Sequence, residues 1–450
     1  MDGGRAGTTL TTMTNSSPLS KSFAALIRLS GLASKMVLAI YMGKFLPLAD
    51  VGAYGLVFGA VMMLFGVLGL KFDFVVSRDI VTASPLVAAR MIRDQAVLYG
   101  SNYLVVAAVG LVVSTSHVTD IPSWQIACVV AIAIFESSAS TLGAILTSLQ
   151  RQVTAYVVFF IRSSLWVVPA VGLGLLLPDF RTASVVLACW AGGGLASLLA
   201  AGFFLRDLPW SKAASLAIDT PWIVRGIRKS LLILIGTTSG TIGFYVDRFV
   251  VMHFLGVEAV GVITLYSSFA NALVALVDSG VLSFTYPRLI KLFNEGETNR
   301  YWRTVRNAAL ESLVLGAVVA LGMGVAVPAM GDVFHRPELA LNKITLWLML
   351  LGLWLRANVR VFYYILYSRH QDKGLWLGDM IYIIPSLGGN ILFVYLFGLP
   401  GIGYGTIASS LYLFFWQGWW VGKGAKISSS AQVDIATDDT LTASRPLAGR

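Results

Sequence analysis

Residues 51–70 read VGAYGLVFGAVMMLFGVLGL, a run of twenty residues without a charged side chain. A helix rises about 1.5 Å per residue, so about twenty apolar residues cross the ~30 Å hydrocarbon core of a bilayer. Similar runs lie at residues 22–43, 96–115, 122–149, 154–177, 182–205, 230–255, 259–285, 307–329, 344–368, 375–397 and 400–421. Such continuous apolar runs exclude the alternating pattern of a membrane barrel. The sequence therefore predicts an all-α integral membrane protein with about twelve transmembrane helices.

The composition agrees with this class. Of the 450 residues, 56% are hydrophobic and 12% are charged, whereas a soluble domain carries ~25% charged residues. The net charge of +10 would suggest nucleic-acid binding in a soluble protein. Here most of it lies in the connections between spans, so it predicts orientation in the membrane and no nucleic-acid partner. Cys128 and Cys189 both lie inside apolar spans, where we expect no structural disulfide.

The basic residues of the connections alternate between the two sides of the membrane. Segments 1–21, 71–93, 206–229, 288–306, 369–373 and 422–450, together with Arg151, hold 23 Lys and Arg residues. The alternate connections hold only Lys44, Arg181, Arg336 and Lys343. Because connections rich in Lys and Arg stay in the cytoplasm, both termini are predicted to be cytoplasmic and the number of spans even.

The two sets of six runs resemble repeats of one unit. FLPLADVG at residues 45–52 matches FLGVEAVG at residues 254–261 at a constant offset of 209, and Arg78 and Arg288 follow at an offset of 210. Two halves of six helices are expected to be parallel repeats with a central cavity between them. The predicted parts are a cytoplasmic polar N-terminus (1–21), an N-terminal six-helix lobe (22–205), a cytoplasmic connector (206–229), a C-terminal six-helix lobe (230–421) and a disordered cytoplasmic tail (422–450).

Six cationic side chains lie inside the predicted spans, where an ionisable group is costly unless it is paired or faces water. They are Arg28, Lys35, Arg162, Arg248, Arg356 and Arg360. Lys35 follows Arg28 by two helical turns and Arg360 follows Arg356 by one, so each pair shares a helix face. We predict a cationic, substrate-binding cavity lined by Lys35, Arg356, Arg360, Arg28 and Arg248. The alternative for Arg28 is that its side chain only reaches out to the cytoplasmic surface.

The acidic residues at this depth are Glu136, Asp247 and Asp278. Glu136 and Arg162 flank a tight hairpin, and their depths differ by less than ~10 Å, so the two side chains can form an ion pair. That pair could fix the hairpin or serve cargo binding or coupling. Asp247 and Arg248 are adjacent and point about 100° apart, so each is expected to pair with another helix. Asp278 is a further candidate for coupling or for a structural ion pair.

No catalytic arrangement is visible in the sequence. The four histidines, His117, His253, His335 and His370, lie at or near span ends and far apart in sequence, and no metal-spaced Cys/His group occurs. The glycines of the connections form no phosphate-binding loop. We therefore expect a protein that is not an enzyme and that carries no cofactor and no metal.

The hairpin motifs carry a resemblance to a known family. GKFLPLADVGAYGLVFGAVMMLFGVLGLKFDFVVSRDI, residues 43–80, resembles the start of Wzx-type polysaccharide transporters of the multidrug/oligosaccharidyl-lipid/polysaccharide exporter superfamily. The seventh span with its Asp247–Arg248 pair and FLGVEAVG, and GIGYGTIASS at residues 401–410, are similar to the second half of that family. The resemblance covers nearly all of residues 20–425.

The resemblance implies a two-lobed flippase that works by alternating access. Its cargo would be a lipid-linked oligosaccharide on an undecaprenyl pyrophosphate-type carrier, moved across the bacterial inner membrane for lipopolysaccharide or exopolysaccharide biosynthesis. Membrane lipids and other polysaccharide assembly proteins would be its further partners. A diphosphate fits a cationic cavity, because Arg and Lys supply charge-assisted hydrogen bonds.

Three alternatives remain at this point. A multidrug cation antiporter of the same superfamily would want an acidic cavity, whereas the excess charge inside the spans is basic. A membrane-embedded polysaccharide polymerase normally needs a sizeable periplasmic loop, but the longest predicted outer connection covers only residues 330–343. A membrane scaffold without transport activity has no positive support in the sequence.

Overall fold

The computed structural model describes the backbone of residues 18–116 and 122–442, and the side chains of Ile27, residues 30–116 and residues 122–423. Within these residues the chain is almost entirely helical, and no strand occurs. Within the described residues ten helical segments are long and apolar enough to cross a membrane. The first is Leu48–Leu68 and the last is Asp372–Phe397. The predicted all-α membrane fold is confirmed.

The first half of the chain consists of the six predicted rods and short irregular pieces between them. Its elements are α1 (Pro18–Phe45), α2 (Leu48–Leu68), α3 (Asp73–Asp79), η1 (Ile80–Thr82), α4 (Pro85–Thr115), α5 (Ser123–Ser148), α6 (Gln152–Phe160), η2 (Ile161–Leu165), α7 (Val167–Leu176), η3 (Pro178–Phe180) and α8 (Ala183–Phe204). The fifth rod runs through α6, η2 and α7, and η2 is a single π-helical stretch inside it.

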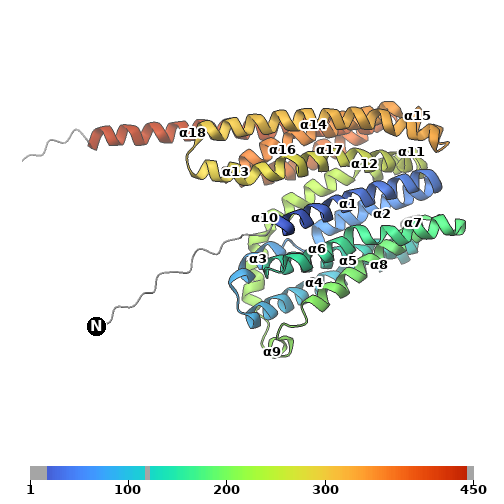
Figure 1. Ribbon diagram of the computed structural model, residues 1–450, viewed down its shortest axis with the longest axis horizontal. Helices are drawn as coiled ribbons and strands as arrows, with labels where there is room; N and C mark the ends of the chain where they lie inside the picture. Colours follow the sequence, from blue (N-terminus) through green and yellow to red (C-terminus); the bar gives the residue numbers. More distant parts are fainter. Residues whose placement is uncertain (1–17, 117–121, 443–450) are drawn as a thin grey trace, which may run out of the picture.

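The second half begins after the short helix α9 (Trp210–Ala214). Its elements are α10 (Thr220–Tyr245), α11 (Asp247–Leu255), α12 (Val257–Val277), η4 (Asp278–Leu282), α13 (Ser283–Asn294), α14 (Thr298–Val333), α15 (Pro337–Leu341), α16 (Lys343–Ser368), α17 (Asp372–Phe397) and α18 (Gly401–Thr442). Figure 1 shows α14 and α16–α18 on one side of the molecule and α4–α8 on the other, with α1, α2 and α10 between them.

Two helix boundaries differ from the sequence prediction. The helix expected from residue 230 begins at Thr220, because the Asp219 carboxylate accepts a hydrogen bond from the Trp222 amide and Pro221 occupies the first turn. At the other end, disorder was expected from residue 422, but α18 continues to Thr442. Extending an existing helix needs no new nucleus, so a polar sequence can continue it. The end of the tail and most of the N-terminal segment, residues 443–450 and 1–17, lie outside the described residues.

The two halves meet where α2 crosses α12, and glycines make this crossing close. A Cβ atom added to Gly52 would lie 2.0 Å from the carbonyl oxygen of Val257, and one added to Gly261 would lie 2.3 Å from that of Leu48. With the sequence offset of 209, Gly52 corresponds to Gly261 and Leu48 to Val257. Each half therefore supplies the same glycine and the same carbonyl to the other, as expected for repeats related by a pseudo-two-fold axis.

The axis passes close to a third pair of equivalent residues. A Cβ atom on Gly55 would lie 1.9 Å from Oγ1 of Thr264, and these two residues are also related by the offset of 209. Farther along the chain, Arg78 and Arg288 are related by an offset of 210. The change from 209 to 210 falls just after α2 and α12, where the backbone of both halves departs from α-helical geometry. There η4 forms a π-helical turn in one half, and Leu70 and Lys71 take positive φ values of 48° and 52° in the other. A π-turn accommodates one extra residue, which accounts for the shift.

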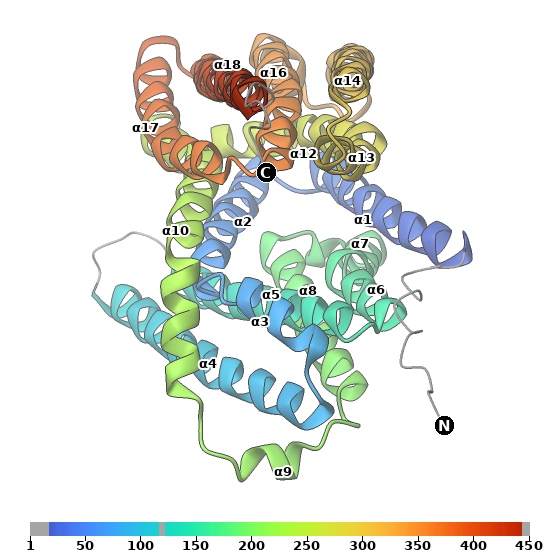
Figure 2. The ribbon, with the colours of Figure 1, turned by 90° about the vertical axis from the view of Figure 1, so that its left-hand side faces the viewer.

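The connector is tied to α4 by a buried polar network. The Asp94 side chain is only 1% exposed, pairs with Arg93 at 2.5 Å and accepts a hydrogen bond from the Asp219 amide. Arg93 also donates to the carbonyl oxygens of Ala213 and Leu216, next to α9. All three guanidinium nitrogens of Arg93 are therefore used, and α9 is held against the first half (Figure 2).

Candidate functional site

A cavity of about 540 Å³ lies between the two halves. It extends along α2 from Tyr54 to Phe65 and along α12 from Thr264 to η4, so it begins at the glycine crossing and continues toward one end of the bundle. Its charged lining residues are Lys35, Glu136, Arg162, Arg248, Asp278 and Arg360. All of these belong to the predicted site residues, and they meet here from helices far apart in sequence.

In the first half the charged group consists of Glu136, Arg162 and Lys35. The Glu136 and Arg162 side chains form the predicted ion pair, with 3.3 Å between Oε2 and Nη1. The other Glu136 oxygen accepts a hydrogen bond from the Trp190 indole at 2.7 Å. Lys35 is exposed to the cavity, and its ammonium lies within 4 Å of no carboxylate of the described residues. This part of the cavity therefore carries one more positive charge than negative.

In the second half Arg360 faces Asp278. Nε of Arg360 lies 3.1 Å from Oδ1 of Asp278, and the Tyr364 hydroxyl donates to the same oxygen at 3.2 Å. Arg360 and Tyr364 are one turn apart on α16 and therefore approach the carboxylate from the same helix face. Asp278 is the first residue of η4, and Arg162, which pairs with Glu136 in the first half, lies in η2. Each of the two ion pairs therefore includes one residue of a π-helical stretch.

The prediction for Asp247 and Arg248 was wrong, because these two neighbours pair with each other. Nη1 of Arg248 lies 2.9 Å from Oδ1 of Asp247, which also accepts from the Arg248 amide at 2.8 Å. Val246, between α10 and α11, keeps helical angles (φ −67°, ψ −21°), so the helix continues from one into the other. The short Asp247 carboxylate folds back onto the next amide and reaches the neighbouring guanidinium as well.

Arg356 is not among the residues that line the main cavity, and its role in substrate binding stays a prediction. It lies in an adjoining pocket of about 30 Å³, with Asp247, Tyr382 and Asn390 among the lining residues. Its guanidinium lies 4.7 Å from the ring centres of both Phe244 and Tyr382 and donates to the Tyr382 hydroxyl. These aromatic contacts hold the side chain beside Phe244, which lines both this pocket and the main cavity. The side chain of Arg28 lies outside the described residues, and only its place on α1 is known.

The cavity arginines differ from the structural arginines in how many nitrogens they use. Arg162, Arg248 and Arg360 each lie within ion-pair distance of a carboxylate through one nitrogen. The same Arg162 nitrogen also donates to the Glu136 carbonyl oxygen, and the other nitrogens of these three arginines have no hydrogen-bond partner in the described part of the chain. Arg151, in contrast, binds Asp207 through two nitrogens, at 2.7 and 2.5 Å, and also donates to a backbone carbonyl. Guanidinium groups with free donors at a cavity wall are suited to binding a further anion.

Sequence reasoning missed the aromatic partners of these charges. Trp190 lies 54 residues from Glu136, and Tyr382 lies 26 residues from Arg356, so no local spacing connects them. Tyr364 could have been found, since it follows Arg360 by four residues and so shares its helix face. The two π-helical stretches have no recognisable sequence signal beyond the change of the repeat offset.

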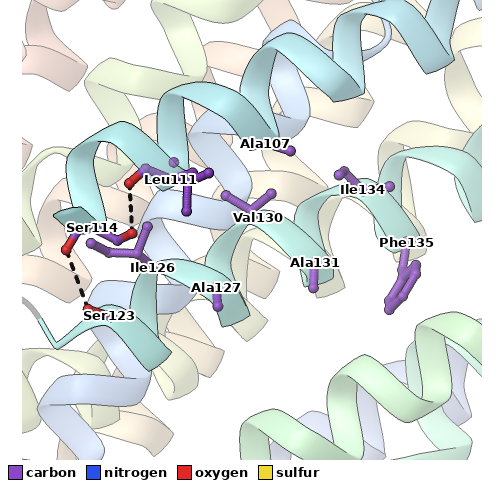
Figure 3. A pocket seen from close by; sticks show the side chains of 11 residues that line it. Ala107, Leu111, Ser114, Ser123, Ile126, Ala127, Val130, Ala131, Ile134 and Phe135 are labelled. Carbon is purple, nitrogen blue, oxygen red and sulfur yellow. Dashed lines mark hydrogen bonds between the residues drawn. The ribbon is translucent and has the colours of Figure 1, made fainter.

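A second large hollow, of about 450 Å³, lies between α4 and α5 and differs in kind from the charged cavity. Figure 3 shows its lining of Leu111, Ile126, Val130 and other small or apolar side chains. Its polar members, Ser114 and Ser123, are hydrogen-bonded to backbone carbonyls. Among the described residues none of those that line it is charged.

Solved structures share this architecture. An inward-facing multidrug resistance MATE family transporter of the MOP superfamily aligns over 89% of this chain and 99% of its own, with a TM-score of 0.68 and 14% identity. The lipid II flippase MurJ, in an inward closed conformation, aligns over 90% and 88%, with a TM-score of 0.68 and 13% identity. The chain has the fold of MOP superfamily transporters.

A third structure, a MOP superfamily transporter from Pyrococcus furiosus described as having a binding pocket of reverse polarity, aligns over 90% of this chain and 95% of its own, with a TM-score of 0.52 and 12% identity. No protein-family model matches the chain, and no curated protein matches it by sequence. The fold therefore places the chain among multi-pass membrane proteins built like these transporters. The cargo has to be argued from the cavity itself.

Proposed function

We propose that this protein is a flippase that moves a lipid-linked oligosaccharide on an undecaprenyl pyrophosphate-type carrier across the bacterial inner membrane. The observation that carries the proposal is the set of cavity cations with unused donors: Lys35, Arg162, Arg248 and Arg360. A diphosphate presents several anionic oxygens in a small volume. Three guanidinium forks and one ammonium can surround such a group with charge-assisted hydrogen bonds.

The carboxylates of the cavity are compatible with this cargo, because they pair with the cations while no cargo is bound. Without Glu136 and Asp278, four positive charges would face one another across a partly desolvated space, which is costly. Each carboxylate engages only one nitrogen of its arginine, so an arriving phosphate can bind the remaining ones. A cationic drug would instead be repelled by Lys35 and three arginines. Only the two carboxylates would attract it.

The place of the cavity supports alternating access between two lobes, residues 22–205 and 230–421. The charge bias of the connections assigns Leu48 and Val257 to the outer face, so the glycine crossing closes that face. The cavity then opens on the cytoplasmic side, where a newly made lipid-linked unit would enter. Rocking of the lobes about the crossing would expose the same charges to the periplasm. Both termini are cytoplasmic in this arrangement.

The MATE neighbours give the antiporter alternative a specific basis, because one of them is described as a multidrug transporter in complex with a ligand. Glu136 and Asp278 are the residues that a cationic drug would use here. The polymerase alternative has less support, since the structural neighbours are transporters. The flippase and the antiporter hypotheses make opposite predictions. Anionic compounds should compete for the cavity of a flippase, and cationic compounds for that of an antiporter.

A deletion strain tests the proposal. Cells without the protein should stop exporting a surface polysaccharide and accumulate its lipid-linked repeat unit on the cytoplasmic face of the inner membrane. Accumulation of the unit in the periplasm, still unpolymerised, would support the polymerase instead. Unchanged polysaccharide together with increased retention of a cationic dye would support the antiporter. Proteoliposomes with the purified protein should move a labelled polyprenyl diphosphate sugar faster than protein-free vesicles do.

A further inference from the structure

A second charged hollow lies far from the central cavity, at the predicted cytoplasmic end of the second half. It has a volume of about 450 Å³ and lies between the turn that joins α16 to α17 and the part of α18 around Trp420. Gln371, Lys373, Trp376 and Lys423 also line it. None of these residues belongs to the charged cavity between the halves.

Two lining residues of this hollow carry polar atoms without partners. The indole nitrogen of Trp420 and the amide oxygen of Gln371 are both shielded from solvent, and neither is hydrogen-bonded within the described residues. Buried polar groups in folded proteins are nearly always satisfied, and leaving one unpaired is costly. Beside this hollow, the unpartnered donor and the unpartnered acceptor are groups that an occupant would satisfy once the two side chains turn toward it.

The charges of the hollow indicate that this occupant is an anion. Lys373 and Lys423 supply two positive charges, and among the described side chains Asp372 is the only carboxylate of the lining. The Lys423 ammonium lies 5.1 Å from the ring centre of Trp419 and 5.5 Å from that of Trp420, so two aromatic faces hold it at the wall of the hollow. Its charge attracts a phosphate to this wall.

The depth of the hollow indicates that the phosphate belongs to a lipid. The membrane-spanning rod α17 begins at Asp372, so the hollow lies where this rod enters the bilayer. Trp419, next to the lining residue Trp420, is 57% exposed. Tryptophans gather at the boundary between hydrocarbon and headgroups, and lysines on the cytoplasmic side attract anionic lipids.

We propose that this hollow binds the headgroup of an anionic phospholipid whose headgroup carries hydroxyls, such as phosphatidylglycerol. The phosphate would accept hydrogen bonds from Lys373, Lys423 and the Trp420 indole. The headgroup hydroxyls would donate to the Gln371 amide oxygen and to Asp372. The bound lipid joins the α16–α17 turn to α18, so its occupancy stabilises the second half of the bundle. The proposal is independent of the cargo of the central cavity.

The test measures lipid retention and thermal stability of the purified full-length protein. Native mass spectrometry and melting curves are recorded with phosphatidylglycerol, with phosphatidylcholine, and with soluble glycerol phosphate. We expect phosphatidylglycerol alone to remain bound and to raise the melting temperature. Replacing Lys423 or Lys373 by Gln should each weaken binding by about fivefold, the usual effect of one lysine near an anionic lipid. Trp420→Phe should weaken binding while leaving the ring contact in place.

Lys291→Gln is the matched control. Lys291 lies on α13 at the same end of the protein, is 72% exposed and does not line this hollow, so its loss should leave retention unchanged. Equal retention of phosphatidylglycerol by the Lys423 and Lys291 variants would overturn the proposal. So would equal binding of phosphatidylcholine by the wild-type protein, a result that does not depend on any variant folding. Displacement of the lipid by glycerol phosphate would assign the hollow to a soluble anion and would also overturn it.

Discussion

Replacing Arg360 by Gln separates a binding role from a structural one. The Arg360 side chain is 43% exposed and that of Asp278 30%, so their ion pair lies in a hydrated part of the cavity. Exposed pairs of this kind contribute about 0–1 kcal/mol to stability. Binding should suffer more, since each charge-assisted hydrogen bond to a phosphate contributes about 1.5–3 kcal/mol. With the terminal nitrogens of Arg360 free to bind cargo, the substitution should weaken diphosphate binding by about ten- to a hundredfold.

The assay compares three variants by the affinity of the purified protein for a short-chain polyprenyl diphosphate and by its melting temperature. Arg360→Gln should melt close to the wild type but bind weakly, and Arg360→Lys should recover part of the affinity because a point charge remains. The double variant Arg360→Gln/Asp278→Asn decides between the readings. A structural pair predicts that removing both charges restores function, whereas a binding arginine predicts continued loss. A folded Arg360→Gln protein with wild-type affinity would refute the reasoning.

Three further predictions concern the fold and the connections. Gly52→Ala should lower the melting temperature and the yield, because its Cβ would lie 2.0 Å from a backbone oxygen. Gly100→Ala is the control, since a Cβ there meets nothing within 4 Å, and it should be neutral or stabilising. Equal behaviour of the two variants would contradict the close crossing. Reporter fusions after Lys229 and at Arg450 should both give a cytoplasmic signal, and a periplasmic one would contradict the charge bias. Arg151 lowers the pKa of the Asp207 carboxyl below its usual 3.8. The ion pair therefore stabilises the protein above that pH, and this stabilisation is lost as the pH falls below it. Asp207→Asn should reduce the loss of melting temperature at acid pH, and an unchanged pH profile would count against the pair.

The sequence predicted the architecture because membrane spans obey a simple requirement. Each span needs a run of apolar residues, and each of the twelve runs lies in a helical rod of the described chain. The repeat offset of 209 marked Gly52 and Gly261 as equivalent positions of two motifs, but it did not predict that they cross at the interface, which the structure shows. Patterns that repeat along the chain can be read without a structure.

The candidate site was less accessible to this reasoning because it depends on contacts between distant segments. Spacing correctly placed Glu136 beside Arg162, where a short hairpin sets the depths of both. It failed for Asp247 and Arg248, because the Asp247 carboxylate folds back onto the neighbouring amide and guanidinium, which the spacing of helix faces does not describe. It did not show that Arg356 lies against the rings of Phe244 and Tyr382 on other helices. Depth along a helix follows from the sequence, but the direction of a charged side chain follows from its neighbours.

The reciprocal contact between α2 and α12 also bears on the origin of the chain. Each half contributes one glycine and one carbonyl oxygen to the other, so the surface of one half is complementary to its own copy. Two separate copies of a six-helix ancestor would have met in the same way, as a symmetric dimer with the axis through the position of Gly55 and Thr264. Gene duplication and fusion through the connector would then have joined two partners that already fitted. After fusion the halves were free to diverge, and the axis position itself differs between them: one half carries glycine there and the other threonine.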